Sequence, residues 1–411
     1  MDLKKIIDKK DLAAQYMVDE ITHICKTFEK RGPGSKGEHQ ACEYAAKQMK
    51  EYGCDRVYVE EFKENPGSFY GWIYFTITCC FLAFGSYLLT PVLSFAPILS
   101  IAFIIIGLAI CFMQFGLYKK LVDKCFKEEI GHNVAGFKKP TGEVKRRIIF
   151  NGHPDAAWEW PFKYKFTYLG FDIHMFLCFG GALYVLILAI LTLAGVIEGE
   201  LVKTLGLIGF VFVPFWFGLY FMWNKKRVVD GANDNLSGCY IGMAILKFLK
   251  DEGIELENTE IGVVLTGSEE AGLRGAKAWA EAHKDEMSDV PTFVYSYDTI
   301  AQSEQLMVNY RDLNGTVKVD KDVSDLFFES CQELGIPCKK GMVPPLGGAT
   351  DSAGFAQAGM RATGITALNH ALPDFYHTRL DTPDALNKDC LAKCFVASVK
   401  VLEKFDDGAK Q

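Results

Sequence analysis

Two blocks of the sequence are apolar at almost every position, which sets them apart from the rest of the chain. Residues 65–118 contain no charged residue, and a short Thr-Pro corner divides them into two long apolar runs. Residues 172–223 follow the same plan, with two apolar runs joined by a short polar turn. Roughly 20 apolar residues are needed to cross the hydrocarbon core of a bilayer. We therefore predict two transmembrane helical hairpins, at residues 68–117 and 172–223.

Buried core helices are the alternative interpretation of these apolar runs. A core helix of a soluble protein rarely runs this long without a polar stripe, so the pattern favours four membrane spans. Pro214 is expected to kink the last span, which membrane helices tolerate. Within the apolar runs no acidic or basic residue marks an ion or proton path, so a transporter is less well supported than an anchoring bundle.

The remaining sequence alternates between short apolar runs and amphipathic stretches. The short runs are typical of strands and lie at residues 57–62, 132–137, 146–152, 260–267, 292–298 and 362–369. The stretches with a helical period lie at residues 12–28, 38–52, 236–249, 273–282, 323–334 and 388–405. Strands that alternate with helices predict an α/β fold with a mostly parallel central sheet and helices on both faces. Residues 1–66, 118–167 and 224–411 are therefore expected to form one domain, which the two hairpins interrupt.

The charges of the chain argue against one class of partner and predict an orientation in the membrane. A net charge of -7 gives no basic field for a phosphate backbone, so nucleic acid is not an expected partner. Basic residues gather beside the spans on one side, whereas the two opposite turns carry only Lys203. By the positive-inside rule, the α/β domain and both termini are expected in the cytoplasm. The 13 cysteines without a C-x-x-C pair and a charged N-terminal segment agree with that location.

Candidate metal ligands follow the predicted strands. They are His153, Asp234, Glu269, Glu270, Asp298 and His377. His153 and the two glutamates directly follow strands, Asp298 ends a strand, and His377 lies in the loop after the last strand. Asp234 stands in a glycine-bounded turn that opens a helix. In open α/β sheets, ligands bind beyond the carboxyl ends of the strands. A random scatter of acids and histidines would not fall at this edge.

The ligand types fit a pair of Zn²⁺ ions. Imidazole with carboxylate is a typical zinc set, and each catalytic zinc needs three protein ligands and an open position. If Asp234 bridges, His153 and Asp298 complete one site, and Glu270 and His377 complete the other. A shared carboxylate allows the roughly 3.5–4 Å separation of two-metal hydrolases. We therefore predict two Zn²⁺ ions, with Co²⁺ or Mn²⁺ as alternatives.

Two further residues have predicted catalytic roles. Glu269 is left without a metal, and its neighbour Glu270 is a ligand, so its carboxylate is expected close to the attacking water as general base. Asp155 lies two residues after His153. It is expected to accept the second imidazole N–H and so fix the tautomer.

The motifs around these residues closely resemble those of the di-zinc aminopeptidase family typified by aminopeptidase S and aminopeptidase Y, which also includes glutamate carboxypeptidase II and the glutaminyl cyclases. The matching pieces are GHPD at 152–155, GANDNLSG at 231–238, TGSEEAGLRGA at 266–276, YSYD at 295–298 and YHTRLDTPD at 376–384. The resemblance implies the zinc exopeptidase fold and the same roles for the residues named above. The hairpins are not part of the common family core. Thr350-Asp351-Ser352 replaces a Ser-Asp-His motif of many members, and Tyr376 or Tyr310 is the candidate oxyanion-stabilising residue.

The sequence thus predicts a membrane-anchored two-zinc aminopeptidase that hydrolyses N-terminal residues of peptides. A carboxypeptidase, a dipeptidase or an N-acyl amino acid amidohydrolase would use the same site. A glutaminyl cyclase is less expected, because that branch of the family works with one zinc. The alternative from another class is a non-catalytic membrane receptor or scaffold, against which the complete ligand set argues. Because the second hairpin separates His153 from Asp234, we hypothesise that the cleft faces the membrane surface or the bundle, with apolar or membrane-derived peptides or amides as substrates.

Overall fold

The computed structural model describes residues 3–369 and 371–409. These residues fold as two compact units. The first, called the sheet unit, is formed by the described residues of Met1–Pro66, Glu128–Trp158 and Lys226–Gln411. The second, called the helical unit, is formed by Gly67–Lys127 and Glu159–Lys225. Residues 118–127 and 159–171, which lie outside the predicted hairpins, therefore fold with the helical unit.

The described part of the sheet unit is built around one sheet of nine strands. These strands are β1 (Arg56–Glu64), β2 (Glu129–Lys138), β3 (Arg146–Gly152), β6 (Thr259–Thr266), β7 (Thr292–Ile300), β8 (Leu306–Asp312), β9 (Val317–Lys318), β10 (Lys339–Met342) and β11 (Arg361–Ala367). Their order is β1-β2-β6-β3-β7-β11-β8-β10, with β9 paired to β8. The central strands β6, β3, β7 and β11 are parallel, and β2 and β8 flank them in the antiparallel direction. The predicted fold class is confirmed.

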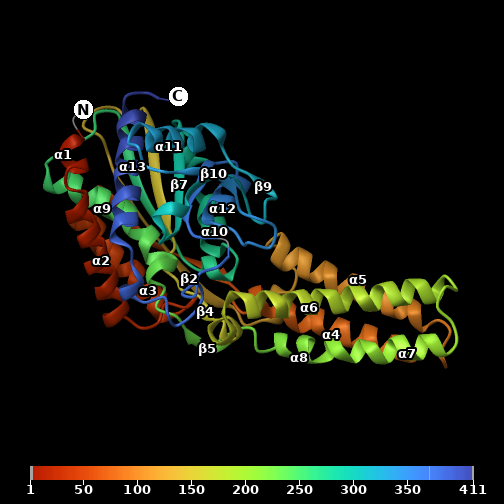
Figure 1. The fold of residues 1–411 in the computed structure, drawn as a ribbon. Helices are drawn as coiled ribbons and strands as arrows, with labels where there is room; N and C mark the ends of the chain where they lie inside the picture. The colour runs from red at the N-terminus through yellow and green to blue at the C-terminus, as the bar shows by residue number, and fades with distance from the viewer. Residues whose placement is uncertain (1–2, 370, 410–411) are drawn as a thin grey trace. The chain divides into compact units, whose positions relative to one another are not determined.

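Helices cover both faces of this sheet (Figure 1). They are α1 (Lys4–Ile7), α2 (Lys10–Thr27), α3 (Lys36–Glu51), α9 (Ser237–Asp251), α10 (Arg274–His283), α11 (Lys321–Glu333), α12 (Asp351–Gln357) and α13 (Lys388–Asp406). Ile148 and Phe150 of β3 pack into a core with α2, α3, α9, α11 and α13, whereas Ile149 packs into a second core with α10 and α12. Successive side chains of a strand point to opposite faces, so a strand between two helical layers is apolar throughout. Separately, β4 (Trp158–Glu159) and β5 (Asn224–Val228) form a two-stranded sheet.

The helical unit contains the apolar blocks of the sequence. Its helices are α4 (Ser68–Leu88), α5 (Ala96–Cys111), α6 (Pro161–Leu193), α7 (Glu200–Ile208) and α8 (Val213–Leu219). Among the described residues, four helical segments are long and apolar enough to cross a membrane: Ser68–Leu88, Ala96–Gly116, Pro161–Leu193 and Glu200–Leu219. The third begins earlier than the apolar run in the sequence and is interrupted at Thr167, whose φ is 58°. In the fourth, α7 ends before α8 begins, and Pro214 stands in the first turn of α8. Proline cannot continue the hydrogen bonding of a preceding helix, which accounts for the break.

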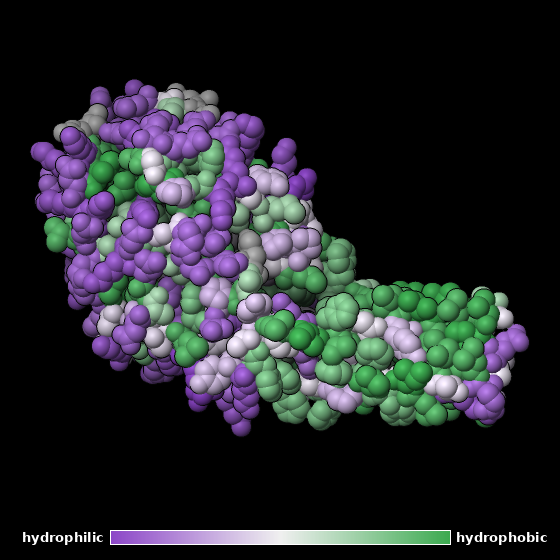
Figure 2. All heavy atoms as spheres, in the orientation of Figure 1, coloured by the Kyte–Doolittle hydropathy of each residue, from purple (hydrophilic) through white to green (hydrophobic). Residues whose placement is uncertain are grey.

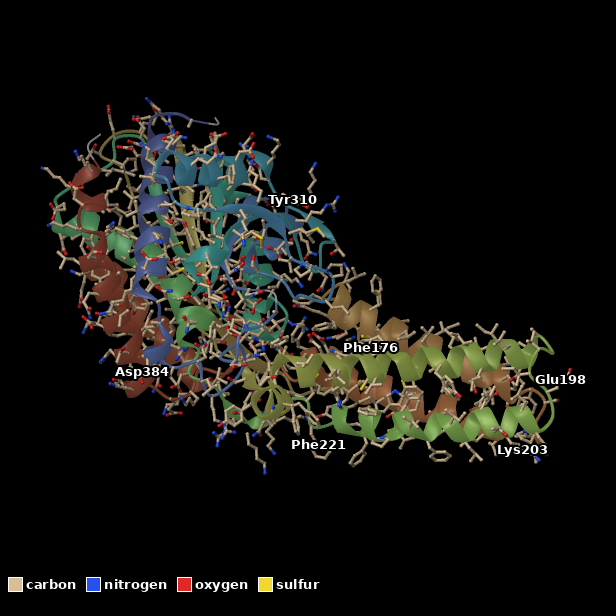
Figure 3. All side chains as sticks on the ribbon, in the orientation of Figure 1. Phe176, Glu198, Lys203, Phe221, Tyr310 and Asp384 are labelled. Atoms are coloured by element: carbon tan, nitrogen blue, oxygen red, sulfur yellow. The ribbon has the colours of Figure 1, made fainter. Side chains whose placement is uncertain are left out.

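Polar and apolar side chains are segregated in the helical unit. Inside it, the Thr76 hydroxyl donates to the carbonyl oxygen of Gly107 over 2.9 Å. On its outside, Phe176 is 75% and Phe221 is 56% exposed, and Figure 3 labels both residues in this unit. Figure 2 shows that the visible surface of these helices is largely hydrophobic. Satisfied polar groups inside and apolar side chains outside are typical of helices surrounded by lipid.

Candidate metal centre

Strand β3 brings His153 and Asp155 to the carboxyl edge of the sheet. His153 follows the last residue of β3 and is 1% exposed. Its Nδ1 lies 3.3 Å from Asp155 Oδ1. The Asp155 carboxylate also accepts the backbone N–H of Glu269 through Oδ1 and that of Glu270 through Oδ2, each over 3.1 Å. Asp155 therefore orients the imidazole and fixes the turn after β6 at the same time.

Asp234 lies in the turn Ala232–Leu236, which opens α9. Asp381 holds this turn, because its Oδ1 accepts the backbone and side-chain N–H groups of Asn233 at 2.8 and 3.0 Å, and its Oδ2 accepts the backbone N–H of Asp234 at 3.1 Å. Burial and the Asp234 carboxylate raise the pKa of Asp381 to about 7. Sequence reasoning gave Asp381 no role, although it stands four residues after His377 in the motif YHTRLDTPD.

The structure brings the five predicted ligands together in two overlapping groups. His153 Nε2 lies 3.5 Å from Asp234 Oδ1 and 3.9 Å from Asp298 Oδ2. His377 Nε2 lies 3.2 Å from Asp234 Oδ2 and 3.3 Å from Glu270 Oε1. Among the described residues, these two groups each have ligand atoms within 4.8 Å of one another. Asp234 offers one oxygen to each group, as a carboxylate that bridges two cations must.

Glu269 lies beside both groups and belongs to neither. It opens the short helical turn Glu269–Ala271 and is 8% exposed. Its Oε2 lies 3.7 Å from His153 Nε2. A carboxylate at this position can accept a proton from a molecule held between the groups without replacing any of the other ligands.

The buried acids of the site repel one another. Burial and the neighbouring Asp234 raise the pKa of Asp298 to about 8, and burial raises the pKa of Glu269 well above its usual range. Burial alone would lower the pKa of His377, but Glu270 and Asp234 raise it to about 9. Negative charge of neighbouring acids contributes to the shifts of Asp298 and His377, and divalent cations would offset it.

The side chains of the two ligand groups fit zinc by their donor atoms as well as by their negative charge. His153 Nε2 is buried and has no hydrogen-bond partner within the described ranges, while carboxylate oxygens face it. A buried imidazole nitrogen without a partner is costly unless a cation binds it. Two imidazoles and three carboxylates are ligand types that zinc prefers. The residues present therefore fit a pair of zinc ions.

The residues where the sequence departs from the family motif form a structural cluster. Asp351 begins α12, and its Oδ2 accepts the Thr266 hydroxyl over 2.6 Å at the end of β6. Burial raises the pKa of Asp351 to about 7. Ser352, which stands where many family members have histidine, donates to Asp312 Oδ2 over 2.8 Å. Ser352 is thus fully buried and held by this hydrogen bond.

The two candidate tyrosines differ in their surroundings. The ring of Tyr376 stacks on the His377 imidazole, with 4.0 Å between ring centroids. Tyr310 is 49% exposed on β8 (Figure 3). Tyr376 is therefore the better placed of the two, although an oxyanion role for it stays a prediction.

Comparison with known proteins agrees with this geometry. Residues 220–402 match the model of Peptidase family M28. No curated protein matches the sequence. Among solved structures, the chain is similar to an aminopeptidase from Aneurinibacillus sp. strain AM-1, at 14% identity and a TM-score of 0.56, over 95% of this chain and 93% of that one. It is also similar to BSAP, a zinc aminopeptidase from Bacillus subtilis, at 13% identity and a TM-score of 0.55, over 95% of each chain.

A further similar structure comes from another branch of the fold. The glutaminyl cyclase of Bacteroides thetaiotaomicron, bound to N-acetylhistamine, shares 12% identity over 96% of each chain, with a TM-score of 0.52. At such low identity, these structural likenesses establish the fold, and the sequence match relates residues 220–402 to peptidase family M28. Together they confirm the resemblance seen in the motifs. The chain has the fold of the zinc aminopeptidases, and its residues 220–402 match peptidase family M28, which supports a metallo-exopeptidase.

Proposed function

We propose that this protein is a membrane-anchored two-zinc aminopeptidase that hydrolyses N-terminal residues of peptides. The observation that carries the proposal is the pair of overlapping ligand groups that share Asp234, with Glu269 beside them and in neither. His153 and Asp298 would complete one zinc site, and Glu270 and His377 the other. Each ion then has three protein ligands, which leaves a position open for water or substrate.

Glu269 acts as the general base in this proposal. Zinc ions, when bound, lower the pKa of water and polarise a substrate carbonyl. Glu269 accepts the proton of the attacking water and returns it to the leaving amine. Its backbone N–H is fixed by Asp155 over 3.1 Å, so the carboxylate stays close to the ligand groups. Asp155 also keeps a proton on Nδ1 of His153, which leaves Nε2 as the metal-binding atom.

The many carboxyl groups of the site favour binding of the free amino end of a peptide substrate over its free carboxyl end. Besides the carboxylate ligands, Asp155, Glu269, Asp351 and Asp381 are all buried within or next to the site. These seven carboxyl groups outnumber the four positive charges of two Zn²⁺ ions, so a protonated α-amino group is attracted to such a site and a substrate carboxylate is repelled. A carboxypeptidase, a dipeptidase or an N-acyl amino acid amidohydrolase remains the alternative use of the same metals. A carboxypeptidase would need a cationic side chain to offset this field.

The four apolar helices serve as the membrane anchor in this proposal, with the sheet unit and both termini in the cytoplasm. Support comes from the length and composition of the helices and from the basic residues that flank the spans on one side. The outward-facing apolar side chains of the helical unit also support insertion into lipid. An enzyme anchored in this way meets apolar or membrane-derived peptides, and these are the substrates we expect.

The test uses the full-length protein purified in detergent. Bound metal is measured first, and hydrolysis is then followed with amino acid 4-nitroanilides and with apolar peptides. Acetylation of the substrate amino group should abolish turnover, whereas amidation of its carboxyl end should not. Glu269→Gln should lower kcat about 10²–10⁴-fold, because proton transfer is lost while the ligands remain. Glu281→Gln, at an exposed position of α10, is the matched control and should leave kcat unchanged.

Three results would replace the proposal. Turnover of acetylated substrates only would favour the amidohydrolase, and dependence on a free carboxyl end would favour the carboxypeptidase. A receptor or scaffold would be favoured if the protein binds about two zinc ions per chain, the stoichiometry of a two-metal site, but hydrolyses no peptide or amide.

A further inference from the structure

Ser268, the residue before the proposed base Glu269, is held between two buried carboxyl groups. Its backbone is left-handed, with φ 57° and ψ 37°, so the chain turns sharply as it leaves β6. A residue with a Cβ seldom adopts this conformation unless the surrounding contacts hold it. Ser268 Oγ lies 2.8 Å from Glu38 Oε2 and makes a short hydrogen bond with Glu64 Oε1.

The two glutamates come from elements far away in sequence. Glu38 stands in the first turn of α3 and is 0% exposed, and Glu64 ends β1 and is 3% exposed. Glu38 Oε1 accepts the backbone N–H of His132 over 2.9 Å, and its Oε2 accepts that of Gly34 over 3.2 Å. A Cβ atom on Gly267 would lie 2.8 Å from Glu38 Cδ. The Glu38 carboxyl therefore rests on the backbone that leads into the catalytic turn.

Ser268 Oγ makes two contacts with carboxyl oxygens, and each contact needs a hydrogen atom. If both glutamates are ionised, only the hydroxyl hydrogen is available, so one contact lacks a hydrogen. The hydroxyl carries a single hydrogen and already accepts the backbone N–H of Gly34 over 3.1 Å. It can therefore donate to Glu38 or to Glu64, but not to both. Two oxygens within hydrogen-bond distance repel each other unless a hydrogen lies between them. The second contact thus requires a hydrogen that one of the carboxyl groups carries itself.

The surroundings of Glu38 favour such a retained proton. Burial, together with the Asp155 and Glu64 carboxylates, raises the pKa of Glu38 well above its usual range. The groups that face it are Asp155 from the loop after β3, Glu64 from β1, the backbone of His132 in β2, Ser268 after β6 and the Cys42 thiol on α3. The charged members of this set are acidic, so they disfavour a second negative charge on the pair.

We propose that Glu38 and Glu64 share one proton through Ser268, and that this pair positions the turn that carries Glu269. The inference rests on the proposed function, because it makes both glutamates positioning residues for the proposed base. With the proton in place, both carboxyl groups contact the hydroxyl and hold Ser268 in its left-handed conformation. With both carboxyl groups ionised, two anions would face one hydrogen, and one contact would be lost.

Infrared spectroscopy of the zinc-loaded, full-length protein tests the proton directly. A protonated carboxyl group has a C=O stretching band that ionised carboxylates lack. The zinc ligands are ionised when zinc is bound, and the other buried acids, Asp351, Asp381 and Glu269, contribute equally to wild type and variants, so the difference spectrum reports on the pair. We expect a band at neutral pH in the wild type that is weaker in both Glu38→Gln and Glu64→Gln by the contribution of one carboxyl group. In each variant the glutamine N–H supplies the hydrogen, so the remaining carboxyl group is ionised. Glu20→Gln is the control, since Glu20 accepts hydrogen bonds from Tyr44 and Gln48 away from this turn.

Kinetics separate positioning from a general structural role. Each single glutamine variant should keep kcat within about threefold of wild type, because one neutral hydrogen-bond donor replaces another. Ser268→Ala removes both contacts and should lower kcat about 10–100-fold, as loss of a supporting hydrogen bond does in metal sites, with KM nearly unchanged.

The proposal is overturned by a protonated-carboxyl band of undiminished intensity in both single variants, or by glutamine variants as impaired as Ser268→Ala. If a variant fails to fold, the wild type decides, since absence of the band at neutral pH is sufficient to overturn it. The band belongs to the resting protein, whereas the proposed function is tested by turnover. A wild type that shows the band but cleaves no peptide would contradict the function alone.

Discussion

The Arg31 guanidinium donates a hydrogen bond through Nε to the carbonyl oxygen of Pro154 over 2.6 Å. Its Nη2 donates to the carbonyl oxygens of Asp230 and Gly231 over 2.6 and 3.0 Å. Pro154 follows the proposed ligand His153, and Gly231 precedes the turn that carries Asp234, the proposed bridging ligand. Arg31 therefore joins two loops that supply ligands to the same proposed zinc ion.

Arg31→Met should weaken both folding and metal binding. The arginine is 2% exposed, and methionine fills much of its volume without an N–H group. Three carbonyl oxygens, two of them in buried hydrogen bonds, would lose a charged donor, so we expect the free energy of unfolding to fall by about 3 kcal/mol or more. Zinc affinity should fall as well, because the two loops are no longer joined. Chemical unfolding in detergent and competition with a chelator measure the two effects.

Arg56→Met provides the comparison for this prediction. Arg56 pairs with Glu286 on the surface, and its side chain is 43% exposed. Loss of a surface ion pair should change the free energy of unfolding by about 1 kcal/mol or less. Equal destabilisation by the two substitutions would show that Arg31 does not join the loops as described.

Asp381→Asn should impair the metal centre from a position outside both ligand groups. The carboxylate accepts three N–H groups of the turn that carries Asp234. An amide keeps one accepting oxygen, and its NH₂ group would face an N–H donor. We expect zinc affinity to fall about 10–100-fold, as it does when groups that orient ligands are lost. Asp384→Asn, at an exposed position nearby (Figure 3), should leave zinc affinity unchanged, and metal competition compares the two variants.

Sequence patterns were sufficient for strands that are buried on both faces. Every residue of β3 and β6 is buried, and such strands appear in the sequence as short apolar runs. The strands β8 and β10 were missed. Strand β10 lies at the edge of the sheet and contains two lysines, and β8, between β11 and β10, ends in the polar stretch Asn309–Asp312. Edge strands commonly carry charged residues that discourage aggregation, so no apolar run marks them.

The proposed ligands could be predicted because each relates to a strand or a glycine-bounded turn, but the residues that hold them could not. Arg31 contacts a carbonyl group 199 residues later in the chain, and no local pattern records such a contact. In a sequence, a buried charged residue looks the same as a solvated one, and most charged residues are solvated. The left-handed Ser268 gave no signal either, because glycine is the residue that usually marks that conformation.

Removal of zinc should destabilise the protein, and its return should restore stability. Without cations, burial and the Asp234 carboxylate raise the pKa of Asp298 to about 8, which reflects repulsion among the ligands. A ligand that binds only the folded state stabilises it by about 4 kcal/mol at a thousandfold excess over Kd. Thermal unfolding with and without a chelator measures the shift. Glu269→Gln keeps all five proposed ligands and should show the full zinc-dependent rise in Tm, whereas His377→Ala should show a smaller one. A Tm that chelation leaves unchanged would contradict a two-zinc site.

The turn between α6 and α7 should lie on the side of the membrane opposite to the sheet unit. Glu198 lies in this turn and Lys203 in the first turn of α7 (Figure 3), and four spans return the chain to the side where the basic residues gather. In a background with the exposed Cys125 replaced by serine, Glu198→Cys should react with a membrane-impermeant maleimide in intact cells. Asp384→Cys should react only after the cells are permeabilised, because the sheet unit is expected in the cytoplasm. Reaction of Asp384→Cys in intact cells, with Glu198→Cys protected, would reverse the orientation, and reaction of both would argue against a four-span bundle.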